Sequence, residues 1–309
     1  MNGKNLSFSI VIPSYNGKRL LAKNLPAVVA ACPDAEIIVV DDASIDDTVA
    51  FLQQEYPKIK VIQLKQNIRF AGACNAGIEN ASSDLVVLLN NDVQPQVDYL
   101  EPIVKIFEDE DVFAIGFKEL NPTDWRNEAA GRASGAYTRG LILHWKAKDQ
   151  TAGPSLWASG GSACFKRNLW LALGGMDRRF SPSYEEDRDI CYRALKRGYK
   201  VLFEPQSQVS HYHETTNEKV LGKRLMRISS YKNQLLLVWK NISDPSWVLK
   251  HILWLPYHLV FTGIYSRGEF ILGFIWALRY LPQILWVRLS HSERLKRSDH
   301  EVLAVFKAL

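Results

Sequence analysis

The first ninety residues alternate short apolar runs with stretches whose apolar residues recur at helical spacing. The apolar runs, rich in β-branched residues, are Phe8–Ile12, Glu36–Val40, Lys60–Leu64 and Leu85–Leu89. The stretches with helical spacing are Leu20–Ala31, Thr48–Tyr56 and Ala71–Asn80. Continuous apolar strands separated by helices are typical of a parallel sheet that helices cover on both faces. We therefore predict an α/β fold with a mostly parallel central sheet.

The pattern is less regular after this region. The stretch Asn121–Gly153 is rich in Gly, Arg and polar residues. A helix is predicted to open within Tyr184–Asp189 and to end near Gly198, because Gly is a common helix stop. A strand, Lys200–Glu204, follows it, and a further helical stretch runs from about Val220 to Trp239.

Two strongly apolar segments near the C-terminus, Trp247–Tyr265 and Phe270–Leu289, approach the length that spans a bilayer. Both are interrupted by polar residues or proline, and His251, His258 and Thr262 form a narrow polar stripe on the first. The charged turn between the segments would be costly to carry across a bilayer. We expect two helices that lie in the membrane interface or dip into it. The alternative is a helical bundle that packs on the rest of the chain or forms a dimer.

Charge is distributed unevenly along the chain, although the net charge is only +5. Residues 1–218 carry 24 Lys and Arg against 28 Asp and Glu, a net −4, whereas residues 219–309 carry 14 against 5, a net +9. The second part also holds five of the nine Trp, and basic and aromatic residues suit an anionic lipid surface. We predict a domain over 1–218 and a helical, basic, Trp-rich, membrane-associating tail over 219–309.

Cysteine use and the N-terminal pattern bear on the compartment. The four cysteines have no regular spacing, which is more typical of reduced thiols in the cytosol than of a disulfide framework or a zinc site. The first apolar run is too short for the core of a secretory signal. We expect a location at the cytoplasmic face of the cell membrane.

Polar clusters follow directly after three of the predicted strands. They are Pro13–Gly17, Asp41–Thr48 and Asn90–Asp92. Each cluster alone is compatible with an ordinary turn or helix cap. An acidic pair at a strand end also suits a pyrimidine ring N–H and ribose hydroxyls, and a carboxylate beside amide oxygens suits Mg²⁺ or Mn²⁺. Because a parallel sheet binds its ligand beyond the carboxyl ends of its strands, these clusters indicate a shared site.

Two later groups add to this picture. Glu186 and Asp187 stand at the start of a predicted helix, where they could cap it or remove a proton from a hydroxyl nucleophile. His211 and His213 follow a strand two residues apart and would point to opposite sides if the strand continues. At most one of the two is expected to be a metal ligand.

Taken in order, these motifs resemble those of the family-2 glycosyltransferases, which have the nucleotide-diphospho-sugar transferase (GT-A) fold. The resemblance extends from about Phe8 to Thr216. Its motifs are Ser9–Asn16, Ile38–Ser44 with Asp46 and Thr48, Asn67 with Phe70–Gly77, Leu88–Asp92, Tyr184–Cys191 with Arg193, and Val209–His211. The chain is most similar to the rhamnosyltransferase-like subgroup, which transfers single sugars onto lipid-linked or cell-surface glycans.

The resemblance implies roles for individual residues. The nucleotide-sugar side of the site would comprise Pro13, Tyr15, Asn16, Asp41, Asp42, Arg69, Asn75 and Asn91. Asp92 occupies the last position of the family's D-x-D motif and would bind Mg²⁺ or Mn²⁺, and His211 matches a late metal ligand. Asp187 matches the general base, with Glu186 beside it. Asn90 replaces the first Asp of D-x-D, and Arg69 stands where the family often has Gly, so we hypothesise that Arg69 reaches the diphosphate.

The function implied is inverting, metal-assisted transfer of one sugar from a nucleoside-diphosphate sugar to a glycan or lipid-linked acceptor, in cell-wall or polysaccharide biosynthesis. No nucleic acid partner is expected. A nucleotidyltransferase is a weaker alternative because Gly17 stands alone where a glycine-rich phosphate loop is needed. A processive synthase is disfavoured by the lack of a Q-x-x-R-W segment after the base. A catalytically inactive scaffold tethered to the membrane is the non-enzymatic alternative.

Overall fold

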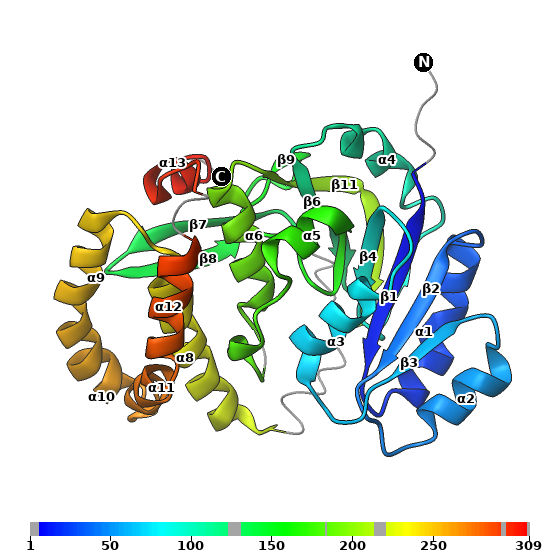
Figure 1. Ribbon diagram of the computed structural model, residues 1–309, viewed down its shortest axis with the longest axis horizontal. Helices are drawn as coiled ribbons and strands as arrows, with labels where there is room; N and C mark the ends of the chain where they lie inside the picture. The colour runs from blue at the N-terminus through cyan, green and yellow to red at the C-terminus, as the bar shows by residue number, and fades with distance from the viewer. Residues whose placement is uncertain (1–5, 123–130, 183, 213–220, 292–294, 308–309) are drawn as a thin grey trace.

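The computed structural model describes residues 6–122, 131–182, 184–212, 221–291 and 295–307 (Figure 1). Within these ranges nine strands form the main sheet, in the order β3-β2-β1-β4-β10-β6-β11-β5, with β9 paired to β11. The strands are β1 (Phe8–Ser14), β2 (Glu36–Asp41), β3 (Lys60–Gln63), β4 (Leu85–Leu89), β5 (Val93–Pro95), β6 (Val112–Leu120), β9 (Gly153–Pro154), β10 (Ser162–Lys166) and β11 (Lys200–His211).

Six of the nine strands in this sheet run in the same direction, and β5, β9 and β10 run against them. Strands β3, β2, β1 and β4 pair in parallel, and so do β6 and β11. Strand β10 lies antiparallel between β4 and β6. The start of β10 therefore lies at the same edge of the sheet as the ends of its neighbours, and loops from both directions of the chain meet there.

Helices cover both faces of the sheet. The helices of the first 200 residues are α1 (Lys18–Ala31), α2 (Thr48–Glu55), α3 (Arg69–Glu79), α4 (Glu101–Val104), α5 (Arg167–Leu173) and α6 (Glu186–Lys196). Helices α1 and α2 share a core with Ile10, Ile12 and Val39, whereas α3, α5 and α6 share one with Val11 and Val40. Alternate residues of each strand thus face opposite layers, as a doubly covered sheet requires. The predicted strands β1 to β4 and helices α1 to α3 are confirmed within two residues.

The part of the chain after Asp92 contains strands that the pattern did not predict. Strands β6 and β10 complete the sheet, and β7 (Ala133–Thr138) pairs with β8 (Leu141–Lys146) in a separate hairpin. Strand β11 continues past the predicted end at Glu204 as far as His211. His211 is therefore the last residue of a strand, and His213 lies outside the described residues.

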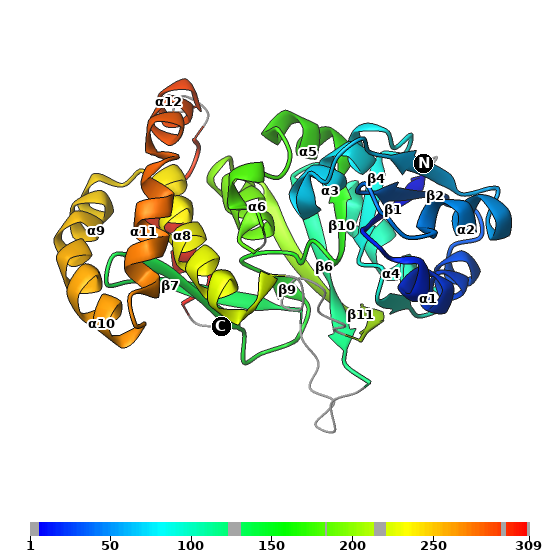
Figure 2. The same cartoon turned by 90° about the horizontal axis from the view of Figure 1, so that it is seen from below.

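The C-terminal region folds into a group of helices on the side of the molecule away from α1 and α2 (Figures 1 and 2). They are α8 (Lys223–Asn241), α9 (Pro245–Tyr257), α10 (Gly263–Tyr265), α11 (Glu269–Leu278), α12 (Leu281–His291) and α13 (Asp299–Ala304). A π-helical segment, His258–Thr262, joins α9 to α10. The two predicted apolar segments are thus helical, and the second breaks before Pro282.

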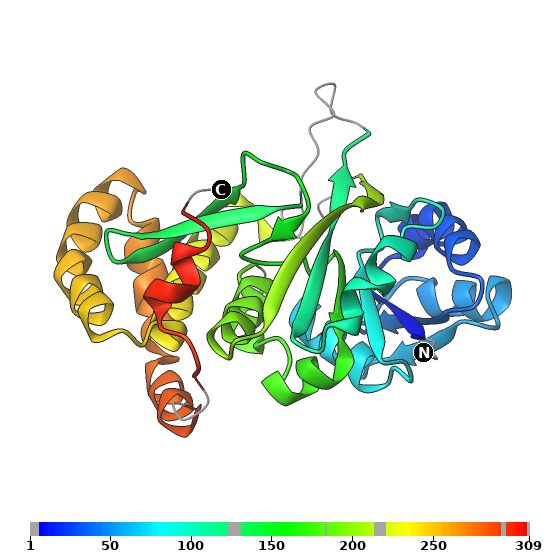
Figure 3. The same ribbon diagram turned by 90° about the horizontal axis from the view of Figure 1, so that it is seen from above.

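The polar stripe of the first apolar segment holds the tip of the β7–β8 hairpin, which reaches from the sheet to these helices (Figure 3). His251 Nδ1 lies 2.7 Å from the carbonyl oxygen of Gly140, and His258 Nε2 lies 2.8 Å from that of Arg139. Because Trp239 Nε1 donates to His251 Nε2, the His251 proton is on Nδ1, where it can reach Gly140. The stripe is therefore a structural contact that fixes which side of α9 faces the hairpin.

Buried polar groups join the C-terminal helices to α6. Asp189 of α6 accepts from Lys240 Nζ at 2.8 Å and from Asn241 Nδ2 at 3.0 Å, both on α8. At the other end of α6, Lys196 Nζ donates to Asp299 Oδ1 at 2.7 Å. These charges are buried and paired, so removing one partner leaves an uncompensated charge in the interior.

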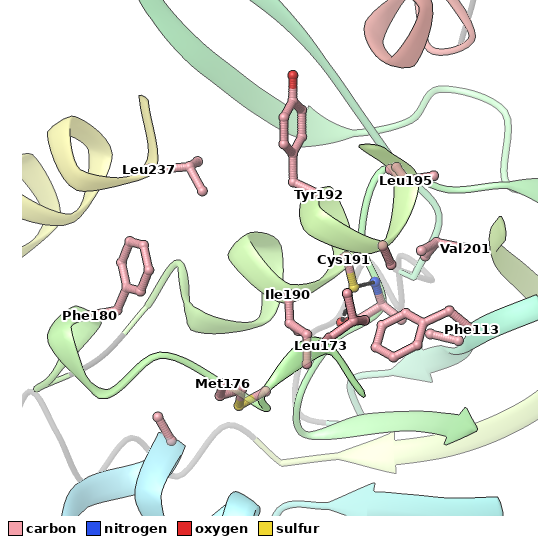
Figure 4. Close-up of a cluster of buried hydrophobic side chains, with 14 of the residues drawn as sticks. Phe113, Leu173, Met176, Phe180, Ile190, Cys191, Tyr192, Leu195, Val201 and Leu237 are labelled. Atoms are coloured by element: carbon pink, nitrogen blue, oxygen red, sulfur yellow. Dashed lines mark hydrogen bonds between the residues drawn. The ribbon is translucent and has the colours of Figure 1, made fainter. Parts of the chain in front are cut away.

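Apolar side chains continue across the same junction. Figure 4 shows Leu237 of α8 with Phe180 and with Ile190, Cys191 and Tyr192 of α6. One hydrophobic core runs from the sheet through α6 into α8 to α13. The boundary predicted between residues 218 and 219 lies outside the described residues, and the helices after it are built into the core of the region before it.

No single described helix is both long and apolar enough to cross a membrane. One bent pair, Glu269–Leu278 with Leu281–Arg288, meets the length and composition needed only when its two parts are taken together, with a bend of 57° between them.

Removing residues 240–309 should prevent the remaining chain from folding. The deletion takes away buried apolar residues, among them Ile242, Phe270 and Phe306, and it leaves Asp189 without Lys240. Each large buried side chain lost from a core costs about 2–5 kcal/mol, so the sum exceeds the stability of an ordinary domain. Thermal unfolding followed by circular dichroism should show no cooperative transition. A truncated chain that unfolds at the wild-type temperature would contradict this account.

Candidate active site

A cavity of about 430 Å³ opens where the strand ends meet. Its walls come from the ends of β1, β4, β6 and β11, from the start of α3, from the segment before β10 and from the start of α6. The lining residues are Pro13, Ser14, Tyr15, Asp42, Asn67, Arg69, Phe70, Ala73, Asn90, Asn91, Asp92, Glu119, Trp157, Ser159, Gly160, Gly161, Pro182, Tyr184, Glu186, Asp187, Arg188 and His211.

Most of the residues singled out from the sequence meet at this cavity. Those on its walls are Pro13, Tyr15, Asp42, Arg69, Asn91, Asp92, Glu186, Asp187 and His211. Asn16, Asp41 and Asn75 are not among its lining residues. Sequence spacing thus placed each motif near the correct strand end, but it did not determine which side chain of a motif turns into the cavity.

The three residues outside the lining make contacts within the protein. Asn16 accepts from the backbone N–H of Ile45 at 2.8 Å, and Asp41 accepts from that of Ser44 at 3.2 Å. Asn75 accepts from the N–H of Met176 at 2.9 Å and donates to its carbonyl oxygen at 2.8 Å. In this structure these side chains shape the loops around the cavity, and their direct contact with a nucleotide sugar stays a prediction.

Asp42 organises the wall next to α3. Its two carboxylate oxygens accept from the backbone N–H groups of Ile68 at 2.7 Å and Arg69 at 2.9 Å. Burial raises the pKa of Asp42, and these two hydrogen bonds partly oppose the rise. Arg69 has a left-handed backbone with φ of +65°, and Asp42 holds it there. The carboxylate thus places the Arg69 side chain on the cavity wall.

Asp92, His211 and Glu119 form a chain of polar contacts across the sheet. His211 Nε2 lies 3.2 Å from Asp92 Oδ1, and His211 Nδ1 lies 3.2 Å from Glu119 Oε2. Ser162 Oγ donates to the other oxygen of Glu119. Burial alone would lower the pKa of His211, but Asp92 and Glu119 outweigh it and raise the pKa to about 9.

These residues fit a divalent metal of the kind that the GT-A fold implies. Neighbouring ligands on an octahedral Mg²⁺ or Mn²⁺ lie roughly 3 Å apart, and Asp92 Oδ1 and His211 Nε2 have that separation. Glu119 faces the other ring nitrogen, so it can accept a hydrogen bond from Nδ1–H, which keeps the proton on Nδ1 and leaves the lone pair of Nε2 available as the ligand atom. In the described part of the chain, no group of three or more His, Cys, Asp and Glu side chains is arranged to hold a metal ion. Two protein ligands would suit a Mg²⁺ or Mn²⁺ ion that keeps waters and substrate phosphates.

The segment that leads into α6 has an unusual backbone. Tyr184 and Glu185 both adopt left-handed conformations, with φ of +72° and +80°. For residues with a Cβ this costs on the order of 1–2 kcal/mol each, so the surrounding structure must impose it. Glu185 is buried and pairs with Arg188 at 2.7 Å, and the Arg188 guanidinium lies 4.7 Å from the ring centre of Trp157. The strain occurs immediately before the two predicted catalytic carboxylates.

The two carboxylates have different surroundings. Glu186 is buried, and its Oε2 atom has no hydrogen-bond partner. Burial, followed by the charge of Asp187, raises the pKa of Glu186 to about 8. Asp187 is only partly buried, and its oxygens accept from the N–H groups of Gly160 at 3.3 Å and Arg188 at 2.8 Å. A carboxylate has about four acceptor positions, so Asp187 keeps capacity to accept a proton from a hydroxyl in the cavity.

Sequence reasoning missed several side chains on the wall. Glu119 lies near the end of β6, a strand that was not predicted. Trp157 was not singled out, and Arg188 lies in the motif Tyr184–Cys191 without an assigned role. A signal for Glu119 existed, since it is an acidic residue near the end of the apolar run that begins at Val112. Its partner His211 is 92 residues away, and no local spacing reveals that contact.

A sheet of this topology with polar residues gathered at the carboxyl ends of its strands is typical of glycosyltransferases with the GT-A fold. Comparison with known sequences agrees: the profile of glycosyl transferase family 2 matches residues 9–168. The chain therefore belongs to glycosyl transferase family 2. The predictions of a glycosyltransferase and of the GT-A fold are both confirmed.

Individual relatives are distant. The O-antigen chain rhamnosyltransferase WbaN of Salmonella anatum is 25% identical over 215 residues, which cover 68% of this chain and 67% of that protein. An uncharacterised glycosyltransferase of Nostoc sp. is 33% identical over 134 residues, covering 42% of this chain and 41% of its own length. The chain thus matches about two fifths of the Nostoc protein and about two thirds of WbaN.

Two solved structures share the fold. The mannosyltransferase PcManGT from Pyrobaculum calidifontis, in complex with GDP-Man and Mn²⁺, has a TM-score of 0.56 at 17% identity and covers 99% of this chain and 85% of its own. GalNAc-T7 with UDP, GalNAc and Mn²⁺ has a TM-score of 0.59 at 21% identity and covers 76% of this chain and 48% of its own. The likeness to PcManGT extends over the C-terminal helices.

Replacing Glu186 with Gln should change how stability depends on pH. The folded pKa of about 8 lies above the ordinary value of 4.5, so the native state binds more protons than the unfolded state between these values. Wild-type stability should therefore fall as pH rises through this window, and the Gln variant should lack that loss. We expect the free energy of unfolding of the variant, measured in urea from pH 4.5 to 8, to rise relative to that of the wild type as the pH increases.

The value at pH 4.5 serves as the internal control, because it reports chiefly how well an amide packs in place of the neutral acid. A difference between variant and wild type that stays constant across the range would show that Glu186 ionises normally in the folded protein.

Proposed function

We propose that the protein transfers a single sugar from a nucleoside-diphosphate sugar to a hydroxyl of a lipid-linked or cell-surface glycan. The reaction is an inverting displacement, metal-assisted, with Asp187 as the general base. The observation that carries the proposal is that Asp187, the Asp92–His211 pair and five of the predicted nucleotide-side residues line one cavity. These five are Pro13, Tyr15, Asp42, Arg69 and Asn91. Together these residues come from six separate parts of the sequence.

The charge of the cavity supports an anionic donor that arrives with a cation. Five carboxylates line it, against two arginines and one histidine. A diphosphate would be repelled by this wall on its own. A bound Mg²⁺ or Mn²⁺, for which Asp92 and His211 are the candidate ligands, would stabilise the charge that grows on the leaving diphosphate. The solved structures with GDP-Man and Mn²⁺ and with UDP and Mn²⁺ support both the donor class and the cofactor.

Asp187 is the better placed of the two carboxylates to act as base. It lines the cavity and is partly accessible, whereas Glu186 is buried and its raised pKa favours the neutral acid near pH 7. Asp187 would take the proton of the acceptor hydroxyl while the oxygen attacks the anomeric carbon. The bond from that carbon to the diphosphate breaks on the opposite side, which inverts the configuration. Arg69 would approach the diphosphate from the start of α3.

The acceptor class is inferred from the relatives. WbaN is an O-antigen chain rhamnosyltransferase, and a further relative from Erwinia amylovora, 24% identical over 225 residues, is an amylovoran biosynthesis glycosyltransferase. Both names refer to bacterial polysaccharides, whose assembly supplies glycan acceptors. The name of neither relative specifies the sugar that this chain would transfer.

The C-terminal helices present an apolar surface that would hold the enzyme on an anionic membrane. We define the apolar surface by its exposed members on α9 to α12: Leu249, Ile252, Leu253, Trp254, Val260, Phe261, Ile264, Tyr265, Ile271, Leu272, Ile275, Leu278, Leu285 and Trp286. Such a run of exposed large side chains marks an interaction site. Lys250, Arg267 and Arg279 are exposed among them, which favours anionic headgroups over an uncharged partner.

The cytoplasmic face of the cell membrane is the location we propose. All four cysteines are buried free thiols, as suits a reducing compartment. A lipid-linked acceptor would be available at that surface.

Asp187→Asn should lower turnover about 10²–10⁴-fold, since a well-placed base contributes that much, and should leave donor binding nearly unchanged.

Asp92→Ala should weaken binding of Mn²⁺ and nucleotide together. A calorimetric screen of nucleotide sugars with Mn²⁺ would identify the donor, and product analysis on a lipid-linked acceptor would follow turnover. Wild-type turnover in the Asn variant would remove Asp187 from its role, and unchanged metal dependence in the Ala variant would remove Asp92.

Charge placed on the apolar surface should abolish membrane binding. Ile264 is 75% exposed and Phe261 is 60% exposed, so replacing both with Glu should preserve the fold and add repulsion from anionic lipid. Flotation with phosphatidylcholine–phosphatidylglycerol vesicles should show the wild type in the lipid fraction and the variant in the soluble fraction. Val97→Glu, at a 75% exposed position on the loop after β5, is the matched control and should float as the wild type does. Equal flotation of both Glu variants would contradict a membrane role for this surface.

A further inference from the structure

Two adjacent polar residues of α8 are fully buried against the segment that precedes the catalytic carboxylates. Lys232 and Asn233 both have 0% exposed surface. Lys232 Nζ donates to the carbonyl oxygens of Arg179 at 2.8 Å and Ser181 at 2.6 Å. Asn233 Nδ2 donates to those of Phe180 at 2.5 Å and Tyr184 at 2.7 Å. We call these two side chains the α8 clamp.

The segment needs such partners because much of its backbone is not paired within a helix or strand. A 3-10 turn, Arg178–Phe180, is followed by Ser181 and Pro182, which lie outside any helix or strand, and Tyr184 and Glu185 have left-handed backbones. Buried carbonyl groups must find donors somewhere, and for four residues of this segment α8 supplies them. Glu186 and Asp187 follow directly, so the direction in which Asp187 enters the cavity depends on where Tyr184 is held.

Two aromatic rings, one on α11 and one just after it, lie next to the clamp lysine. The Lys232 ammonium lies 4.6 Å from the ring centre of Trp276 and 5.5 Å from that of Tyr280. Gly273 lies against the backbone of α8, where an added Cβ would come within 2.8 Å of the carbonyl oxygen of Ile228 and 3.0 Å of the backbone nitrogen of Lys232. The lysine is therefore confined between aromatic rings and the carbonyl oxygens that it binds.

The clamp does not depend on one charge state of the lysine. Burial lowers the pKa of Lys232 to about 7, and the charges of Glu186 and Asp177 oppose that shift. A neutral amine still has two N–H groups, which is the number that its two carbonyl partners require. Its contact with the segment can persist on both sides of neutral pH.

We propose that Lys232 and Asn233 are positioning residues for the transfer reaction: by holding the carbonyl groups of residues 179–181 and of Tyr184, they set the placement of Asp187 in the cavity. This inference rests on the proposed function for its effect on turnover. The C-terminal helices would then be part of the catalytic apparatus as well as a membrane anchor. The clamp also links α11, which carries part of the apolar surface, to the segment before Asp187.

Lys232→Met tests the clamp because it keeps an unbranched side chain beside the aromatic rings and removes the amine that donates both hydrogen bonds. Lys196→Met is the matched control, since Lys196 is also buried, at 2% exposure, and also binds across to the C-terminal region, through Ser243 Oγ and Asp299. It lies at the far end of α6 from Asp187. Asn233→Ala is the second clamp variant and decides the question if Lys232→Met does not fold.

We expect the clamp variants to lower kcat at least 10-fold while KM for the donor changes less than 3-fold, because a small misplacement of a base is costly. Hydrogen exchange in peptides covering 178–188 should accelerate at least 10-fold in the clamp variants. In Lys196→Met this segment should exchange at the wild-type rate, and kcat should fall less than 3-fold.

Equal exchange of 178–188 in clamp and control variants would overturn the proposal, as would equal kcat values at matched losses of Tm. The exchange measurement needs no substrate. If the wild type transfers no sugar from any nucleotide sugar tested, the proposed function fails, and the exchange comparison still decides whether the clamp holds the segment.

Discussion

The structure depends on how one short segment before α6 is held. Tyr184 and Glu185 adopt left-handed conformations that their side chains disfavour, and carbonyl groups around them are bound by side chains of α8. Glu185 is fixed in turn by Arg188, which stacks on Trp157. Contacts from three parts of the chain therefore impose a backbone that the local sequence does not favour. The positions of the two carboxylates at the start of α6 depend on these contacts.

Buried charge is the second feature that organises the molecule. The carboxylates are paired with cations at one place and outnumber the cations at another. At the junction with the C-terminal helices each buried carboxylate has close cationic partners, as Asp189 has in Lys240 and Arg193. In the cavity the carboxylates outnumber the cationic side chains, and the pKa of Glu186 is raised. Paired charges join the two regions, whereas the excess negative charge at the strand ends suits a site that receives a metal and a diphosphate.

Local pattern was sufficient for the first half of the sheet, because β-branched runs such as Leu85–Leu89 and amphipathic stretches such as Leu20–Ala31 have periods that sequence displays directly. It also located the strand-end clusters. The local pattern did not reveal that Asn75 forms hydrogen bonds with the backbone of Met176, or that Glu119 faces His211. These contacts join residues about 100 positions apart. Nor could it separate the buried side of the C-terminal helices from the exposed side. The two apolar segments have large apolar side chains on both sides, and contacts with the β7–β8 hairpin orient α9, among them those of His251 and His258 with the hairpin tip.

The central claim is a single displacement at the cavity with Asp187 on the acceptor side and the diphosphate on the metal side. The configuration of the transferred sugar tests it most directly. Once the donor is identified, proton NMR of the product, taken before any anomeric equilibration, measures the coupling constant at the new linkage. The account predicts an anomeric configuration opposite to that of the sugar in the donor. Retention of the donor configuration would contradict it.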